Sequence, residues 1–185
     1  MIKKSKLTHF ILIQILVLII NKEICAWDDK VTHKDLSQYA TENSVIDISK
    51  GNFLKFLGYH AGLGAKFVWD NKSQSVLLWI REGAEFEDKS SPLFPVSGTS
   101  RSLNHFHNPL KPWAQSGLDD WFISHYAGES SLLWAQDGNN QQNVVEGDWS
   151  WQKTREYYSV ALTSLNDSDR QANFAKTFRG LGHQM

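Results

Sequence analysis

The sequence predicts an all-α fold in a single domain. Apolar residues recur at spacings of three and four along several segments, as in helices that bury one face. Segments in which apolar and polar residues alternate, as in half-buried strands, are nearly absent. The chain of 185 residues is long enough for one globular domain and too short for two of ordinary size. We therefore expect one multi-helix domain.

Residues 1–26 have the organisation of a secretory signal peptide. Three lysines precede an apolar run of 11 residues, which has the length of a signal core and is too short to span a bilayer comfortably. The polar residues that follow end in Ala26, a small residue suited to peptidase cleavage. An uncleaved membrane anchor is one alternative, whereas a lipoprotein attached through Cys25 is disfavoured because a bulky residue precedes it. We expect a secreted or periplasmic mature chain that begins at Trp27.

The first half of the mature chain contains three predicted helical segments. Thr32 can cap a helix that begins at the next residue, with Asp35 in its first turn. Residues 51–57 carry apolar side chains at helical spacing. Residues 72–84 are predicted to form a longer helix whose apolar face consists of Val76, Leu77, Ile80 and Ala84.

The second half begins with a long irregular segment and then returns to helix. Residues 85–112 are rich in proline and turn-forming residues, and loops of that length are often functional. A short helix is expected over residues 130–137, and a longer one runs to residue 164 with Asp148 as its cap. Asp167 opens a last helix whose apolar stripe consists of Phe174, Phe178, Leu181 and Met185.

The last predicted helix has no termination signal before the end of the sequence. Its apolar stripe continues to Met185 without a capping glycine, a polar final turn or a proline. We therefore expect residues 27–185 to be the amino-terminal part of a domain that is truncated at its C-terminal end. With no later element to cover them, Phe174, Phe178 and Leu181 are expected to be exposed, so that the isolated chain tends to aggregate.

Charge and cysteine content exclude several functional classes. The full chain has a formal net charge of −1, and cleavage removes four of 19 basic and one of 20 acidic residues, which leaves 15 against 19 and a charge of −4. Such a chain is poorly suited to extended, non-specific binding along a nucleic-acid backbone, and no stable nucleic-acid partner is expected. A single cysteine excludes a disulfide framework and a cysteine-cluster metal site. The sequence contains neither a glycine-rich phosphate loop nor a Gly-X-Ser-X-Gly motif, so nothing in it supports nucleotide-driven or serine-hydrolase chemistry.

Two groups of residues have the chemistry of partial metal sites. His105 lies in the irregular segment and Asp88 lies 17 residues before it, so that together they offer an imidazole nitrogen and a carboxylate to a cation such as zinc. Cleavage after residue 26 exposes the α-amino group of Trp27, whose ordinary pKa of about 7.7–8.0 makes a lone pair accessible to a metal. Its carbonyl oxygen can close a chelate ring, and His33 follows six residues later.

The motifs around these residues resemble the zinc-dependent phospholipase C and single-strand-specific nuclease superfamily. Residues 27–33, Trp-Asp-Asp-Lys-Val-Thr-His, resemble the start of those enzymes, where a Trp binds zinc through its amino and carbonyl groups and a His ligand follows. Residues 105–109, His-Phe-His-Asn-Pro, resemble the His-Phe-aromatic-Asp-Pro motif of the bacterial phospholipases, whose first His binds zinc together with an upstream Asp. The resemblance implies that the metal ligands include Trp27, His33, Asp88 and His105.

Some positions in these motifs leave alternatives open. Glu87 competes with Asp88 for the role of the upstream acidic ligand. Asn108 replaces the usual Asp of the family motif, and His107 occupies the aromatic position, so we do not expect it to be a ligand.

The end of the chain resembles the stretch before the core ligand motif of the family. Residues 181–185, Leu-Gly-His-Gln-Met, resemble the Leu-Gly-X-X-Met stretch that precedes His-X-X-X-Asp. In this alignment the ligand His would follow Met185 directly, and His183 would be structural. We expect the reading frame to continue with that His and with an Asp four residues later.

The resemblance implies an exported zinc-dependent phosphodiester hydrolase with a multinuclear zinc site that activates water. A phospholipase C-like activity is the first expectation, with phospholipid or another phosphodiester as substrate and with contact to a membrane surface. The alternatives are a single-strand nuclease of the same superfamily and a non-catalytic secreted helical binding module or inactive fragment. Because residues 27–185 supply only part of a cluster, we expect this portion alone to bind zinc weakly and to be inactive.

Overall fold

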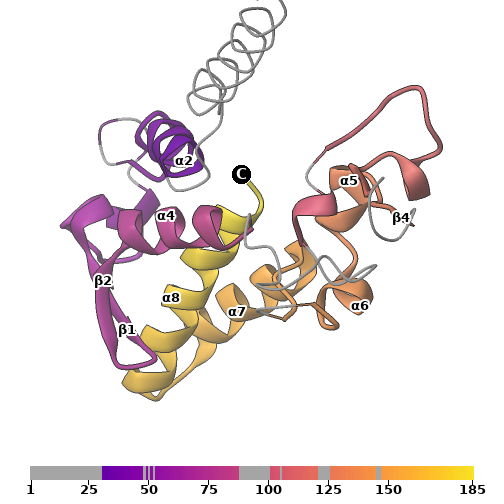
Figure 1. Ribbon diagram of the computed structural model, residues 1–185. Coiled ribbons are helices and arrows are strands. Elements are labelled where there is room, and N and C mark those ends of the chain that lie inside the picture. The colour runs from indigo at the N-terminus through magenta and orange to yellow at the C-terminus, as the bar shows by residue number, and fades with distance from the viewer. Residues whose placement is uncertain are drawn as a thin grey trace, which may run out of the picture.

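The computed structural model describes a mostly helical chain. The described residues are 31–47, 49, 51, 53–87, 101–104, 106–120, 126–144 and 147–185. The longest helices among them are α2 (Thr32–Glu42), α4 (Val76–Glu87), α7 (Trp151–Thr163) and α8 (Asp167–His183) (Figure 1). The shorter helical elements are α3 (Phe53–Phe56), η1 (Gly62–Gly64), η2 (Arg101–Asn104), η3 (Trp113–Gln115), α5 (Ser131–Trp134) and α6 (Gly138–Gln141). None of the helices in the described ranges is both long and apolar enough to cross a membrane.

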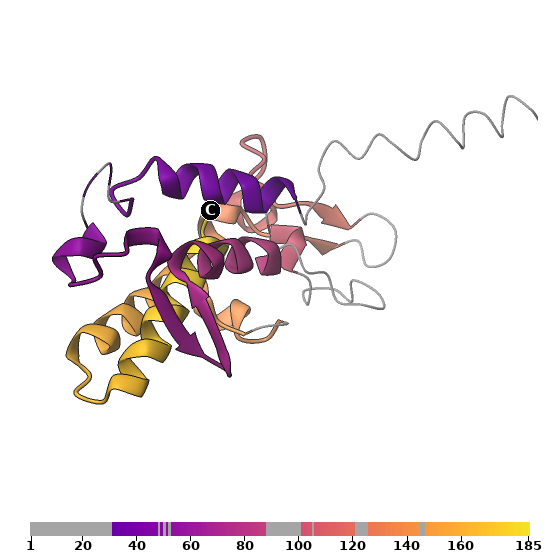
Figure 2. The same cartoon turned by 90° about the vertical axis from the view of Figure 1, so that its left-hand side faces the viewer.

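Helices α4, α7 and α8 and strand β1 (Lys66–Trp69) enclose the apolar core. Helix α8 packs against α4, α7 and β1, and α2 lies along the other side of α4 (Figures 1 and 2). The largest buried apolar side chains in this core are Leu54, Phe67, Trp79, Ile80, Phe174 and Phe178. Burial of each side chain of this size contributes roughly 1.5–3 kcal/mol, so this cluster is the main source of stability.

Two glycines allow α4 and α8 to approach each other closely. A Cβ atom at Gly83 would lie 2.0 Å from the carbonyl oxygen of Arg179, and a Cβ at Gly182 would lie 2.0 Å from the carbonyl oxygen of Ile80. Neither contact is sterically possible, so the crossing needs glycine on both helices. This close crossing places the C-terminal end of α4 beside the C-terminal end of α8.

The prediction of helix over residues 72–84 is wrong for its first four residues. Strand β2 (Lys72–Ser75) pairs antiparallel with β1, with Lys66 opposite Ser75 and Trp69 opposite Lys72. The turn between them uses Asp70 and Asn71 at φ values of 51° and 59°, which is the left-handed conformation that a tight hairpin requires and that Asp and Asn tolerate. A second pair joins β3 (Asp119–Asp120) and β4 (Tyr126–Ala127). The described part of the chain is therefore mostly α, with two small β pairs.

Two predicted helix caps lie one or two residues from their expected positions. Thr32 is the first residue of α2 and Val31 occupies the cap position without a side-chain hydrogen bond. The hydroxyl of Ser150, and not the carboxylate of Asp148, accepts a hydrogen bond from the backbone N–H of Lys153 at the start of α7.

The expected exposure of Phe174, Phe178 and Leu181 is wrong, and Leu181 is partly buried against the core. Phe174 and Phe178 are both buried, because β1 and α7 cover the face of α8 that carries them. Because these side chains are buried, they give no reason to expect that the chain aggregates.

Candidate functional site

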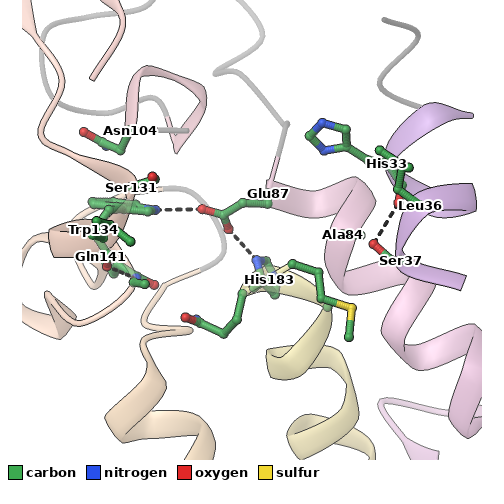
Figure 3. A pocket seen from close by; sticks show the side chains of 15 residues that line it. His33, Leu36, Ser37, Ala84, Glu87, Asn104, Ser131, Trp134, Gln141 and His183 are labelled. Carbon is green, nitrogen blue, oxygen red and sulfur yellow. Dashed lines mark hydrogen bonds and ion pairs between the residues drawn. The ribbon is translucent and has the colours of Figure 1, made fainter. Parts of the chain in front are cut away.

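A pocket of about 300 Å³ lies where α2, α4, α5 and α8 come together (Figure 3). The polar side chains at its wall come from six different elements. They include His33 of α2, Glu87 of α4, Asn104 of η2, Trp134 of α5, Gln141 of α6 and His183 of α8. Figure 3 shows His33 on the α2 side, Asn104 and Trp134 on the opposite side, and Glu87 between them. The pocket therefore collects residues that are far apart in the sequence.

Glu87 is the centre of the hydrogen-bond network in this wall. Its Oε1 accepts a hydrogen bond from the indole Nε1–H of Trp134 at 2.7 Å. Its Oε2 accepts one from Nε of Arg101 at 2.7 Å and lies 2.6 Å from Nδ1 of His183. Both carboxylate oxygens are thus engaged by donors from η2, α5 and α8.

Arg101 balances the charge of Glu87 inside the protein. Its side chain is only 1% exposed, and its remaining nitrogens donate to the carbonyl oxygen of Gly147 and to Oε1 of Gln141, both at 2.9 Å. The guanidinium also lies over the Trp134 ring, with Cζ 5.2 Å from the ring centroid. A buried charge that is paired and fully hydrogen-bonded is tolerated, whereas an unpaired one is costly.

His183 is neutral near pH 7 and its ring is held on two sides. Burial lowers its pKa to about 4, against the opposing effect of the Glu87 carboxylate. Because a carboxylate only accepts hydrogen bonds, we assign the proton of the neutral imidazole to Nδ1, which then donates to Glu87. The ring stacks on Trp149 with a centroid separation of 5.0 Å and an interplanar angle of 6°. Its Nε2 is buried, and no residue in the described part of the chain gives it a hydrogen bond.

His33 lies in the first turn of α2, and its half-buried side chain lines the pocket. The two residues that follow it form ion pairs with α4: Lys34 pairs with Glu85 at 2.5 Å, and Asp35 pairs with Arg81 at 3.4 Å.

Of the four sequence-predicted ligands, the described residues include His33. Trp27, Asp88 and His105 lie outside the described ranges. The residues that directly precede two of them, Glu87 and Asn104, both line the pocket that contains His33. Within the ranges that the structure describes, no group of three or more His, Cys, Asp or Glu side chains is arranged to hold a metal ion.

Sequence reasoning missed the network that builds this wall. It treated Glu87 only as a competing ligand, and it did not single out Arg101, Trp134 or Gln141. No local pattern identifies these partners, because Arg101 lies 14 residues from Glu87 and Trp134 lies 47 residues away. His183 was expected to be structural, and its buried, stacked ring agrees with that role, although the same residue borders the pocket.

His107 has a packing role in the neighbouring loop. Its Nδ1 lies 2.9 Å from the hydroxyl of Ser130, and its ring meets Trp113 edge to face at 5.6 Å. These contacts hold His107 in the loop that follows η2.

No protein-family model matches this chain, and no curated protein or solved structure matches it significantly.

Proposed function

We propose that this chain is part of an exported zinc-dependent phosphodiester hydrolase of the phospholipase C and nuclease type. The observation that carries the proposal is the composition of the pocket: His33 lines it together with Glu87 and Asn104, the residues that directly precede Asp88 and His105.

The types of donor atom fit zinc. His33 and His105 offer imidazole nitrogens, Asp88 a carboxylate, and Trp27 its α-amino and carbonyl groups after cleavage. Asp88 is the acidic ligand that we propose first, and Glu87 is the alternative.

Bound zinc would lower the pKa of a coordinated water to about 7 and offset the charge that builds on phosphate oxygens. The ligands would be His33 on α2 together with Trp27, Asp88 and His105, while Glu87 and Arg101 form an ion pair in the surrounding wall. A pocket of about 300 Å³ is at the small end of ligand sites and suits a phosphodiester headgroup better than a long polymer. Phospholipid is therefore the first substrate class that we propose, and single-stranded nucleic acid is the second.

The proposal is tested with the exported protein at its natural length. We expect hydrolysis of phosphatidylcholine that a chelator abolishes and added zinc restores. His33→Ala should lower this turnover by about 100-fold or more, because the ion loses a direct ligand. His60→Ala is the matched control, since His60 is exposed and is not among the residues that line the pocket.

Three other results would change the interpretation. Turnover of single-stranded DNA in place of lipid would support the nuclease alternative. Ligand binding without turnover of either substrate would support a binding module. Turnover that the chelator does not affect would contradict the assignment of zinc.

A further inference from the structure

We propose that residues 106–118, which we call the apolar loop, form the surface by which this protein binds a phospholipid bilayer. The choice of phospholipid rests on the proposed function, whereas the apolar loop itself consists only of described residues. Four of its large apolar side chains are about half exposed or more, and they are Phe106, Leu110, Trp113 and Leu118. Single exposed apolar residues are ordinary, but a group of them on one short segment indicates an interaction site.

Hydrogen bonds to the start of α5 hold the backbone of the apolar loop. The N–H of Ser130 donates to the carbonyl oxygen of Trp113 at 2.7 Å. The next N–H, that of Ser131, donates to the carbonyl oxygen of Phe106 at 3.0 Å. Because the two donors are consecutive, the backbones of the two exposed aromatic residues lie close together. Leu110 lies between them in the sequence and is 92% exposed.

The charge of the apolar loop fits insertion among lipid headgroups. It carries no acidic side chain, although 20 of the 185 residues of the chain are Asp or Glu. Its one formally charged side chain is that of Lys111, and Asp119 and Asp120 follow after its end. Tryptophan, phenylalanine and leucine readily enter the interfacial region of a bilayer, whereas an ionised carboxylate is costly to bury there.

The shape of the apolar loop favours a bilayer over a protein partner. Figure 1 shows it projecting from the molecule beyond α5. A stable protein interface takes about 20–30 residues from each side, and the apolar loop has only 13. Fluid lipid surrounds a projecting segment without needing a surface of complementary shape. A projecting loop with few charges and several exposed apolar side chains is therefore suited to lipid.

The apolar loop is attached to the wall of the pocket. Ser131, which holds the carbonyl oxygen of Phe106, is the first residue of α5 and lines the pocket together with Leu132. The side chain of Leu132 is itself half exposed. Insertion of the apolar loop into a bilayer would hold this wall at the lipid surface, where phospholipid headgroups are presented.

The experiment measures binding of the exported protein at its natural length to phosphatidylcholine vesicles. Cosedimentation is carried out with a chelator present, so that zinc-dependent turnover does not alter the lipid. Leu110→Ala should lower the partition coefficient by about 10-fold, because less apolar surface enters the bilayer. Leu165→Ala is the matched control, since Leu165 is 98% exposed and lies between α7 and α8, far from the apolar loop in both views (Figures 1 and 2). It should bind as the wild type does.

A second measurement reports insertion directly. Leu110→Cys and Leu165→Cys are each labelled with an environment-sensitive fluorophore in a Cys25→Ser background, so that the label has one site. The emission of the label at position 110 should shift to shorter wavelength when vesicles are added, and that of the label at position 165 should not. Circular dichroism confirms that each variant is folded, which we expect because both leucines are exposed.

Three results would overturn the inference. Equal vesicle binding by Leu110→Ala and the wild type, or a shift at both labelled positions, would show that the apolar loop is not the bound surface. Binding to anionic vesicles alone, lost in high salt, would show that charge and not apolar insertion holds the protein. Self-association that Leu110→Ala abolishes, without vesicle binding, would make the apolar loop an interface between copies of the chain.

Failure of this inference and failure of the proposed function are distinguishable. Chelator-sensitive hydrolysis without binding through the apolar loop would reject the inference and leave the proposed function in place. Binding through the apolar loop without turnover of either substrate would support the inference and reject the proposed hydrolase.

Discussion

At the scale of single residues, the buried pair of Glu87 and His183 makes stability depend on pH. His183 has no exposed side-chain surface, and its neutral form is packed between Glu87 and the Trp149 ring. The charged groups that face it, Arg101 and Arg179, further disfavour its protonation. In the folded protein, the His183 ring therefore takes up its second proton only when the pH falls to about 4.

We predict that stability falls as the pH drops from about 6.5 to about 4. In the folded state the pKa of His183 is lowered from 6.5 to about 4, so between these values the unfolded chain binds a proton that the folded chain does not. Acidification across this window therefore lowers the free energy of unfolding by up to about 3 kcal/mol. Above about pH 6.5 this contribution of His183 is fully retained. Urea denaturation at a series of pH values measures the effect.

His183→Gln should flatten this pH dependence, whatever its effect on stability at pH 7. His60→Gln, at an exposed position, should leave the slope unchanged. An equal slope in His183→Gln and the wild type would show that other groups cause the acid sensitivity.

At the scale of elements, the crossing of α4 and α8 sets the geometry of the pocket wall. Gly83 and Gly182 allow the two helix backbones to approach closely. Glu87 follows Gly83 on α4 and His183 follows Gly182 on α8, and Oε2 of Glu87 lies 2.6 Å from Nδ1 of His183. Any substitution that separates the helices also separates these two side chains. The core and the pocket wall therefore share one structural determinant.

We predict that Gly182→Ala lowers the free energy of unfolding by about 1–3 kcal/mol, even though alanine favours helix by about 1 kcal/mol. The new Cβ would lie 2.0 Å from the carbonyl oxygen of Ile80, so a backbone must move. Gly64→Ala is the control, because a Cβ there meets nothing within 4 Å. Equal stability of the two variants, measured by denaturant unfolding, would show that the helices separate at little cost.

At the scale of the whole molecule, the described chain combines an apolar core with a region that polar contacts attach to it. The buried residues of the main core cluster all lie between Leu54 and Ile80 or between Ala161 and Phe178. The described residues from 101 to 144 contribute none of that cluster. They contact the rest through Arg101 and Trp134, which both donate to Glu87, and through Gln141, whose Oε1 accepts a hydrogen bond from the backbone N–H of Trp149.

We predict that hydrogen exchange separates these two regions. The amide hydrogens of α4 and α8 should exchange most slowly, because opening them exposes the apolar core. The amides of α5, α6 and residues 106–118 should exchange at a lower free energy of opening, because less apolar surface is exposed when they open. Uniform protection along the chain, measured by mass spectrometry after proteolysis, would contradict this division.

Most of the helical structure could be predicted from the sequence, because it depends on local patterns. The apolar spacing along residues 167–183 predicts α8, and the same spacing predicts most of α4. The β1–β2 hairpin was missed because its strands have four residues each and its turn residues, Asp70 and Asn71, are also common in loops. His33 was singled out by its distance from the predicted cleavage site.

The sequence by itself determined the helical segments, the predicted signal peptide and the chemical types of the proposed metal donors, since each of these depends on neighbouring residues. Only the tertiary structure decided that Glu87 is engaged by Arg101, Trp134 and His183, and that His33 lies in the same pocket. The physical reason is that hydrogen bonds and ion pairs act over about 3 Å in space and are independent of separation along the chain. Helix packing therefore determines which donor reaches a buried carboxylate. In this protein, the close crossing of α4 and α8 at Gly83 and Gly182 brings His183 to Glu87.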